Sequence, residues 1–173
     1  MMNNAYDVII IGGGIVGLST ALTLAQSASE MKIAIIDQKC LAAPNVSQHY
    51  DLRVFAINAA SQRLFQQLNC FDSMKQHRVS LYHSMCVWDG FAEGEIRFYA
   101  QDIAKAELGF IIENQVILSS LHQQLKLYNQ IKLIDQTSLQ NIFTSIDNRY
   151  ELIINPQKKL TAQLIIGADG ANS

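Results

Sequence analysis

Apolar positions in this chain gather in short runs that alternate with polar turns. The runs at 7–11 and 32–36 have the length of a buried strand, and residues 15–26 between them carry apolar side chains at helical spacing. A strand, a helix and a second strand in such close succession predict a parallel βαβ unit. We therefore expect an α/β fold that begins with a parallel sheet.

A glycine-rich turn, Gly12–Gly17, joins the first strand to the helix with the spacing G-x-G-x-x-G. This spacing between a strand and a helix is typical of dinucleotide-binding units. Gly12 permits the tight turn, Gly14 leaves room for a pyrophosphate, and Gly17 lets the helix lie close to the sheet. The pyrophosphate would lie at the helix N-terminus, where free N–H groups and the helix dipole favour an anion.

Asp37 ends the second predicted strand, 20 residues after Gly17. Dinucleotide-binding units place an acid at this distance to bind a ribose hydroxyl, so we predict this role for Asp37. The alternative is that Asp37 is only a water-exposed acid at the end of a strand and binds no ligand. A carboxylate here also disfavours a nucleotide with a 2′-phosphate, because two negative charges would face each other.

Short elements continue along the rest of the chain. The pattern predicts a polar loop at 41–50, then a helix capped by Asn58 and ending near Leu68, then strands at 84–88 and 95–99 around a turn at 89–94. A short apolar run at 110–112 is followed by a predicted helix at 114–128 and a predicted strand at 131–134. The remaining elements are an antiparallel meander at 139–143, 150–154 and 160–162, and a strand at 163–166. The last strand leads into a second glycine turn, Gly167-Ala168-Asp169-Gly170.

Composition limits the partners of the chain. Its 173 residues are 49% hydrophobic and 16% charged, with a net charge of −2, which indicates a globular core and no surface for nucleic acid. Three widely separated cysteines predict free thiols in a reducing compartment and no metal site. The apolar run at 8–11 is too short to span a membrane, so we expect a cytoplasmic protein; binding at a membrane surface stays open.

Several segments together resemble one family. The second turn, G-A-D-G at 167–170, is similar to the Asp-Gly motif of the class A FAD-dependent aromatic monooxygenases. Asp51–Asn58 resembles the D-x-R-x-x-A-I segment of the subgroup that hydroxylates ubiquinone precursors, Met85–Asp89 its M-x-V-W-D segment, and Leu108–Asn114 its L-G-F-x-I-E-N segment. The segments occur in the family's order across nearly all of the chain.

The resemblance assigns further residues to FAD. Asp169 and Gly170 match the motif that serves FAD and the nicotinamide cofactor. Arg53 matches an arginine near the FAD pyrophosphate and flavin edge, with a surface salt bridge to Asp51 as the alternative. Asn114 matches a position near the ribityl–phosphate region, with a helix N-cap as the alternative. The residues predicted to bind the cofactor are therefore Gly12, Gly13, Gly14, Ile15, Val16, Gly17, Asp37, Gln38, Arg53, Asn114, Asp169 and Gly170.

The resemblance also implies an activity. The family's enzymes are FAD-dependent monooxygenases that hydroxylate an aromatic or quinol precursor in ubiquinone biosynthesis. The implied partners are molecular oxygen, a quinol or phenol precursor with a prenyl tail, and NADH or NADPH as transient reductant. Association with a membrane surface, with other enzymes or with further copies of the chain stays open. No catalytic residue and no metal ligand is assigned.

Chains of this family continue beyond the G-A-D-G turn with a substrate-binding sheet, so we expect an N-terminal fragment. Residues 1–173 are predicted to form the Rossmann-like FAD-binding domain, with part of the substrate-domain sheet drawn from about 79–112 and that domain left incomplete. We expect these residues alone to bind FAD weakly or not at all and not to catalyse hydroxylation.

Other functions share the same first turn. One is a catalytically inactive FAD-binding remnant. Another is an NAD-dependent Rossmann oxidoreductase, which would continue with alternating strands and helices rather than with a meander. A flavin disulfide reductase is disfavoured because it needs two closely spaced cysteines, and Cys40 has none nearby.

Overall fold

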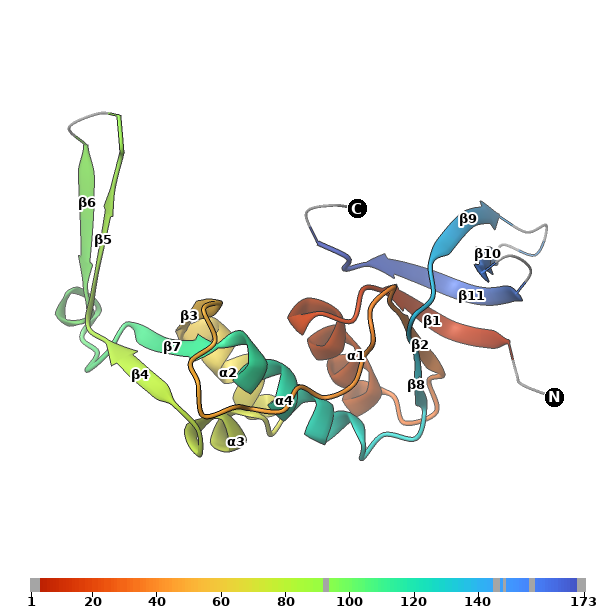
Figure 1. The fold of residues 1–173 in the computed structure, drawn as a ribbon, viewed down its shortest axis with the longest axis horizontal. Coiled ribbons are helices and arrows are strands. Elements are labelled where there is room, and N and C mark those ends of the chain that lie inside the picture. Colours follow the sequence, from red (N-terminus) through yellow and green to blue (C-terminus); the bar gives the residue numbers. More distant parts are fainter. Residues whose placement is uncertain (1–3, 92–93, 145–146, 148, 156–157, 171–173) are drawn as a thin grey trace. The chain divides into compact units, whose positions relative to one another are not determined.

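The computed structural model describes residues 4–91, 94–144, 147, 149–155 and 158–170. The chain forms two compact units, one from residues 1–43 and 121–173 and the other from residues 44–120. Figure 1 labels the helices and strands of both units. Residues 92–93 of the turn predicted at 89–94 lie outside the described residues.

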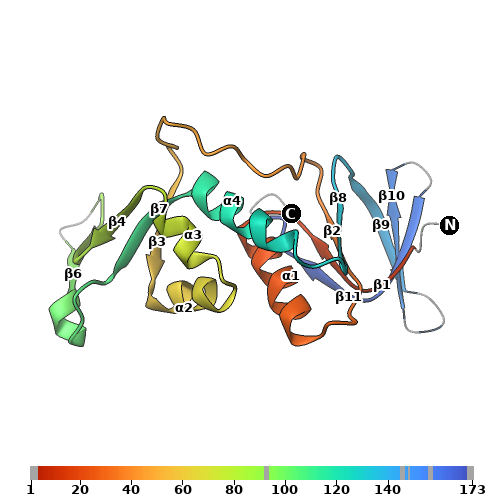
Figure 2. The ribbon, with the colours of Figure 1, turned by 90° about the horizontal axis from the view of Figure 1, so that it is seen from below.

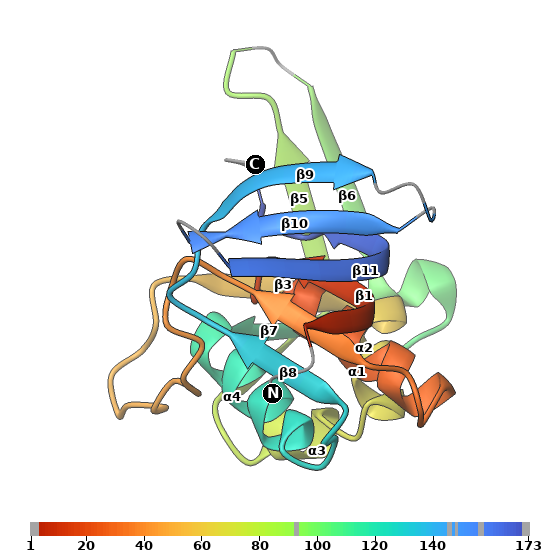
Figure 3. The ribbon, with the colours of Figure 1, turned by 90° about the vertical axis from the view of Figure 1, so that its right-hand side faces the viewer.

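The first unit is built on a six-stranded sheet with the order β8-β2-β1-β11-β10-β9 (Figure 3). Its strands are β1 (Ala5–Ile11), β2 (Ile33–Ile36), β8 (Ile131–Ile134), β9 (Leu139–Thr144), β10 (Tyr150–Ile154) and β11 (Lys158–Gly167). Strands β8, β2, β1 and β11 pair in parallel, whereas β10 and β9 extend the sheet in antiparallel fashion. The predicted α/β fold, with a parallel sheet and an antiparallel meander, is confirmed.

Helix α1 (Ile15–Ser27) follows β1 after three residues and leads to β2. All four residues of β2 are buried, as expected for a central strand of a parallel sheet. Small and apolar side chains form the buried face of α1, among them Leu18, Ala21 and Leu22. The predicted helix and strands of the βαβ unit thus form within two residues of their expected bounds.

One prediction about the C-terminal strands was wrong. The sequence pattern suggested separate strands at 160–162 and 163–166, but β11 is a single strand of ten residues. Its first half pairs with β10, where Leu152 lies opposite Leu160, and most of its length pairs with β1, where Ile11 lies opposite Gly167. The meander therefore continues the parallel sheet, because one long strand belongs to both.

The core of the first unit runs through both parts of this sheet. A buried cluster joins residues of β1, β2, β10 and β11: Ile9, Ala34, Ile36, Leu152, Ile154, Leu160 and Ala162. Tyr6, Ile11 and Ile134 pack against this cluster and are only partly buried. Burial of a single continuous apolar layer holds the parallel strands and the meander together.

The second unit contains two small antiparallel sheets and short helices (Figure 2). Its elements are β3 (Val54–Asn58), α2 (Ala59–Gln67), α3 (Phe71–Lys75), β4 (Val79–Tyr82), β5 (Ser84–Trp88), β6 (Glu95–Tyr99), the 3₁₀ helix η1 (Ala100–Ile103) and β7 (Gly109–Glu113). One sheet has the order β3-β7-β4, and the other is the hairpin of β5 and β6. Helix α4 (Asn114–Leu125) begins directly after β7.

Helices α2 and α3 lie beside the three-stranded sheet (Figure 2). Phe71 of α3 meets Phe110 of β7 edge to face, with ring centroids 5.1 Å apart. Asn58 caps α2 as predicted, since its side-chain oxygen accepts from the amides of Ala60 and Ser61. Phe65 and Leu68 are buried and Leu64 is half-buried, which agrees with the helical spacing of these apolar residues.

Four elements of the second unit were not predicted from the sequence: β3, α3, β4 and the 3₁₀ helix η1. Strand β3 buries one of its five residues, Ile57, and α3 is only five residues long, so neither has a strong local pattern. The predicted strands at 84–88 and 95–99 are confirmed, whereas α4 ends at Leu125 instead of Tyr128. Among the described residues no helix is long and apolar enough to cross a membrane.

Candidate functional site

The glycine turn after β1 owes its shape to two close backbone approaches. Gly12 has a φ of +106°, and a Cβ there would overlap the carbonyl oxygen of Ala168. A Cβ on Gly17 would overlap the carbonyl oxygen of Gly12. Both positions therefore require glycine for packing within the protein. The sequence predicted a tight turn at Gly12, but its contact with Ala168 is visible only in the structure.

Gly14 differs from these two glycines because it faces open space. It is exposed, and a Cβ at this position would meet no atom within 4 Å. Gly14 is also the N-cap of α1, and the first helical hydrogen bond runs from the amide of Leu18 to its carbonyl at 2.9 Å. The amides of the first turn, before Leu18, donate no hydrogen bond within the helix, so the helix N-terminus can bind an external acceptor.

Asp37 lies at the carboxyl end of β2 and binds the glycine turn directly. Its Oδ2 accepts from the amide of Gly13 at 2.7 Å, and its Oδ1 accepts from the amide of Lys39 at 2.8 Å. The side chain is half-buried, while the neighbouring Gln38 is exposed. The carboxylate thus shapes the turn, and its remaining lone pairs leave room for a ribose hydroxyl.

The second glycine turn lies next to the first. The amide of Ala168 donates to the carbonyl of Ile11 at 2.7 Å, and β11 pairs in parallel with β1, so both turns leave the same edge of the sheet. Asp169 and Gly170 are exposed beyond this bond, and Gly170 has a φ of +88°. Two predicted cofactor segments more than 150 residues apart in the sequence therefore come together in the first unit.

In the second unit, Arg53 and Asn114 also come together. Val54 of β3 pairs with Glu113 of β7, so the residues before and after them are neighbours. The amide of Asn114 donates to the carbonyl of Arg53 at 2.9 Å. Two residues predicted separately to contact FAD are thus adjacent, one just before β3 and the other at the start of α4.

The alternatives for these two residues can be compared with the contacts. The Asp51 side chain binds the backbone of Arg53, since its Oδ1 accepts from the Arg53 amide at 3.0 Å. Among the described ion pairs none involves the Arg53 guanidinium, which lies over the ring of Phe55 at 5.2 Å from its centroid. At the start of α4, the Oδ2 of Asp51 accepts from the amide of Gln115 at 3.2 Å and so serves as a cap.

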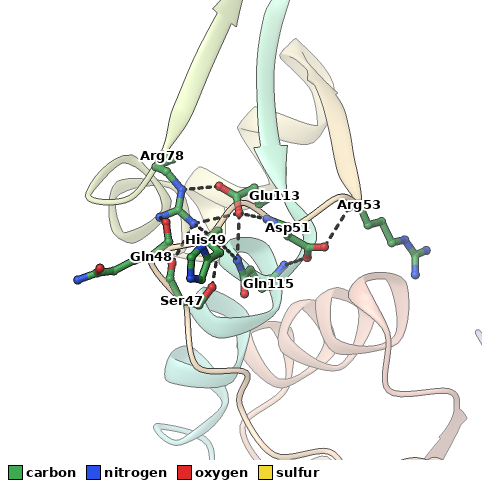
Figure 4. A network of polar contacts seen from close by, with 8 residues as sticks. All are labelled: Ser47, Gln48, His49, Asp51, Arg53, Arg78, Glu113 and Gln115. Carbon is green, nitrogen blue, oxygen red and sulfur yellow. Dashed lines mark hydrogen bonds and ion pairs between the residues drawn. The ribbon is translucent and has the colours of Figure 1, made fainter.

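Next to Arg53 lies a polar network centred on the buried carboxylate of Glu113 (Figure 4). Glu113 is 4% exposed and accepts from Nε of Arg78 at 2.7 Å, from the amide of Asp51 at 2.7 Å and from Nε2 of Gln115 at 3.0 Å. The hydrogen bond from Arg78 is the main reason that the pKa of Glu113 falls to about 2. The carboxylate is therefore charged throughout the physiological range of pH.

Arg78 extends this network to the loop before β3. Its Nη2 donates to the carbonyls of Ser47 at 3.0 Å and His49 at 3.2 Å, and its guanidinium lies 5.0 Å from the centroid of the Tyr50 ring. No role was predicted for Arg78 from the sequence. An acid at the end of an apolar strand, as at Glu113, was the available signal for a buried ion pair, but nothing in the sequence indicated its partner.

The described residues contain no cluster of His, Cys, Asp and Glu that could hold a metal ion. Burial raises the pKa of Cys70 to about 12, so this thiol is not poised for reaction. The chemistry that these surfaces offer is anion and nucleotide binding: a glycine turn at a helix N-terminus, an acid beside it, and an exposed guanidinium in the other unit.

Comparison with known proteins agrees with this geometry. Residues 7–50 match the family model of FAD dependent oxidoreductases. The chain is 30% identical to the ubiquinone biosynthesis monooxygenase COQ6 of Dictyostelium discoideum, covering 99% of the chain and 38% of that protein. It is 31% identical to the 3-demethoxyubiquinol 3-hydroxylase of Escherichia coli K12, covering 100% of the chain and 43% of that protein.

Solved structures show the same fold. Pseudomonas aeruginosa PqsL in complex with 2-aminobenzoylacetate matches 98% of this chain and 44% of its own with a TM-score of 0.73 at 17% identity. The p-nitrophenol 4-monooxygenase PnpA of Pseudomonas putida matches 99% of this chain and 42% of its own with a TM-score of 0.71 at 16% identity.

The fold and its two glycine turns define the FAD-binding domain of class A flavoprotein monooxygenases. Within that class, the chain is similar along nearly its whole length to the ubiquinone hydroxylase family of FAD-dependent monooxygenases. It spans less than half the length of the relatives cited above. The resemblance inferred from the sequence is thereby confirmed.

Proposed function

We propose that the protein acts in ubiquinone biosynthesis as an FAD-dependent hydroxylase of a quinol or phenol precursor with a prenyl tail. The observation that carries this proposal is the pair of glycine turns at one edge of the parallel sheet, with Gly14 facing open space at the start of α1. The hydroxylase function of the relatives supports the choice of reaction.

The first unit would hold the nucleotide half of FAD. The pyrophosphate would lie against the amides of Gly14, Ile15 and Val16 at the start of α1, where the helix dipole favours an anion. Gly13 would border this site in the turn, with its own amide bound to Asp37. Asp37, with Gln38 next to it, would bind the adenosine ribose, and Asp169 with Gly170 would meet the cofactor from the second turn. Gly12 and Gly17 would support this surface by packing rather than by contact.

Arg53 and Asn114 are adjacent in the second unit, and the family resemblance assigns them to the FAD pyrophosphate and the ribityl–phosphate region. The Arg53 guanidinium is exposed and carries a permanent charge, which suits the pyrophosphate and the electron-rich edge of the flavin. Bound FAD would supply the electron transfer and the oxygen activation, with NADH or NADPH as reductant. The contribution of this chain is then to bind and orient the cofactor.

The test begins with the full-length gene product. We expect it to purify with flavin absorbance, to oxidise NADH or NADPH, and to convert a prenylated phenol into its hydroxylated product, identified by mass spectrometry. The matched control is Gly14→Val, which should fold and lack flavin. Bound flavin without coupled hydroxylation would favour an inactive remnant. Binding of NAD without flavin would favour a dehydrogenase and overturn the proposal.

A further inference from the structure

Both backbone polar groups of Arg53 are engaged, while its side chain is not paired with a carboxylate among the described residues. Its amide donates to Asp51, and its carbonyl accepts from the amide of Asn114. Figure 4 shows the Arg53 side chain directed away from the polar network. The backbone of Arg53 is therefore held at both its amide and its carbonyl, and the guanidinium extends from it over the Phe55 ring.

Asp51 connects that backbone to the start of α4. Its two carboxylate oxygens accept from the amides of Arg53 and Gln115, so it joins β3 to the helix. Its own amide donates to Oε2 of Glu113 at 2.7 Å. Displacement of Glu113 would thus release Asp51, and release of Asp51 would free Arg53 on its N-terminal side.

The buried charge of Glu113 needs a partner to remain in place. An unpaired carboxylate in such a position would be unfavourable, and the fork of the Arg78 guanidinium supplies two hydrogen bonds, at 2.7 and 3.1 Å. Arg78 is 31% exposed and also binds the carbonyls of the loop that leads to Asp51. A lysine could provide the charge at this position but not the fork.

We propose that Glu113 and Arg78 are positioning residues that hold Asp51 and thereby present Arg53 to the bound cofactor. The inference rests on the proposed FAD-dependent function and adds two residues that touch no cofactor themselves. A general structural role would lower stability without any special link to Arg53. A positioning role predicts that the effect of Glu113 on FAD affinity passes through the Arg53 side chain.

A double-mutant cycle on FAD affinity separates these roles. The full-length protein and its Arg53→Ala, Glu113→Gln and doubly substituted forms are titrated with FAD after removal of bound flavin. We expect Arg53→Ala to weaken binding about 10-fold or more, as for loss of a charged hydrogen bond. Glu113→Gln should weaken it by about 3- to 10-fold, and should have no further effect when Arg53 is already alanine.

Two companion variants complete the experiment. Glu95→Gln makes the same change in an exposed ion pair of the hairpin and should leave FAD affinity unchanged. Arg78→Lys keeps the positive charge and should reproduce the dependence on Arg53, which provides a second cycle if Glu113→Gln fails to fold.

Four outcomes decide the matter. Loss of the Glu113 or Arg78 effect in the Arg53→Ala background supports the inference. Equal effects in both backgrounds, or none in either, overturn it while the proposed function stands. An Arg53→Ala protein that binds FAD normally also overturns it. Failure of the unaltered protein to bind FAD overturns the proposed function and this inference together.

Discussion

The two units build their candidate binding surfaces from different materials. In the first unit the surface is backbone and small residues, shaped by contacts such as that of Gly12 with Ala168. In the second unit it is a set of charged side chains around Glu113, with Arg53 at its border (Figure 4). The surface of the first unit is shaped mainly by close backbone packing at glycines, whereas that of the second unit is shaped by charged side chains.

This difference predicts different sensitivities. Close backbone packing leaves no space for an added carbon atom, so the first unit should respond to the size of a substituted residue. A buried ion pair depends on the charge and number of its hydrogen bonds, so the second unit should respond to pH and to isosteric changes of charge. Four predictions test the contrast, beginning with the largest expected effect.

Gly17→Ala should destabilise the protein by about 3 kcal/mol or more, because the new Cβ would overlap the carbonyl of Gly12 and the start of α1 would have to move. Denaturant unfolding followed by circular dichroism measures the loss. Gly14→Ala makes the same change in open space and should lower stability by no more than about 1 kcal/mol. Equal losses in both variants would contradict the steric explanation.

Gly14→Val should leave the fold intact and lower FAD affinity at least about 100-fold, since the branched side chain would occupy the space expected for the pyrophosphate. Flavin absorbance after gel filtration, with unfolding curves on the same sample, separates binding from stability. Normal flavin content in a folded variant would mean that the pyrophosphate does not approach this turn.

Asp37→Ala should weaken FAD binding by about 1.5–3 kcal/mol, the range for a hydrogen bond to a charged group. The carboxylate also accepts from the amide of Gly13, so stability should fall as well. Asp37→Asn retains an acceptor oxygen for Gly13 and should recover part of that stability. Calorimetric titration with FAD gives the affinities; a loss within error would leave Asp37 with only its role in the turn.

The Glu113 ion pair should make stability depend on acid pH. The folded-state pKa of Glu113 is lowered from 4.5 to about 2, chiefly by the hydrogen bond from Arg78. Its contribution is therefore fully present above about pH 4.5 and is lost as the pH falls toward 2. Glu113→Gln should be less stable at neutral pH and show a flatter curve below pH 4.5. Parallel curves for both proteins, from urea unfolding at several pH values, would contradict this.

Local sequence pattern determined the elements that are stable over short stretches. The strand, glycine turn, helix and strand of residues 7–36 and the Asn58 cap of α2 depend on neighbours a few residues away, so their spacing was sufficient. The same is true of the hairpin formed by β5 and β6. The resemblance of several segments to one family was also readable, because it lies in the order of residue types.

Tertiary structure alone decided which distant segments meet. The continuity of β11, the contact of Gly12 with Ala168 and the pairing that brings Arg53 next to Asn114 all depend on strand register. The partner of Glu113 could not be read from the sequence, because Arg78 is 35 residues away and no local periodicity connects them. Spacing along a chain indicates helices, strands and turns. The partner of a buried charge depends instead on which strands pair and in which register.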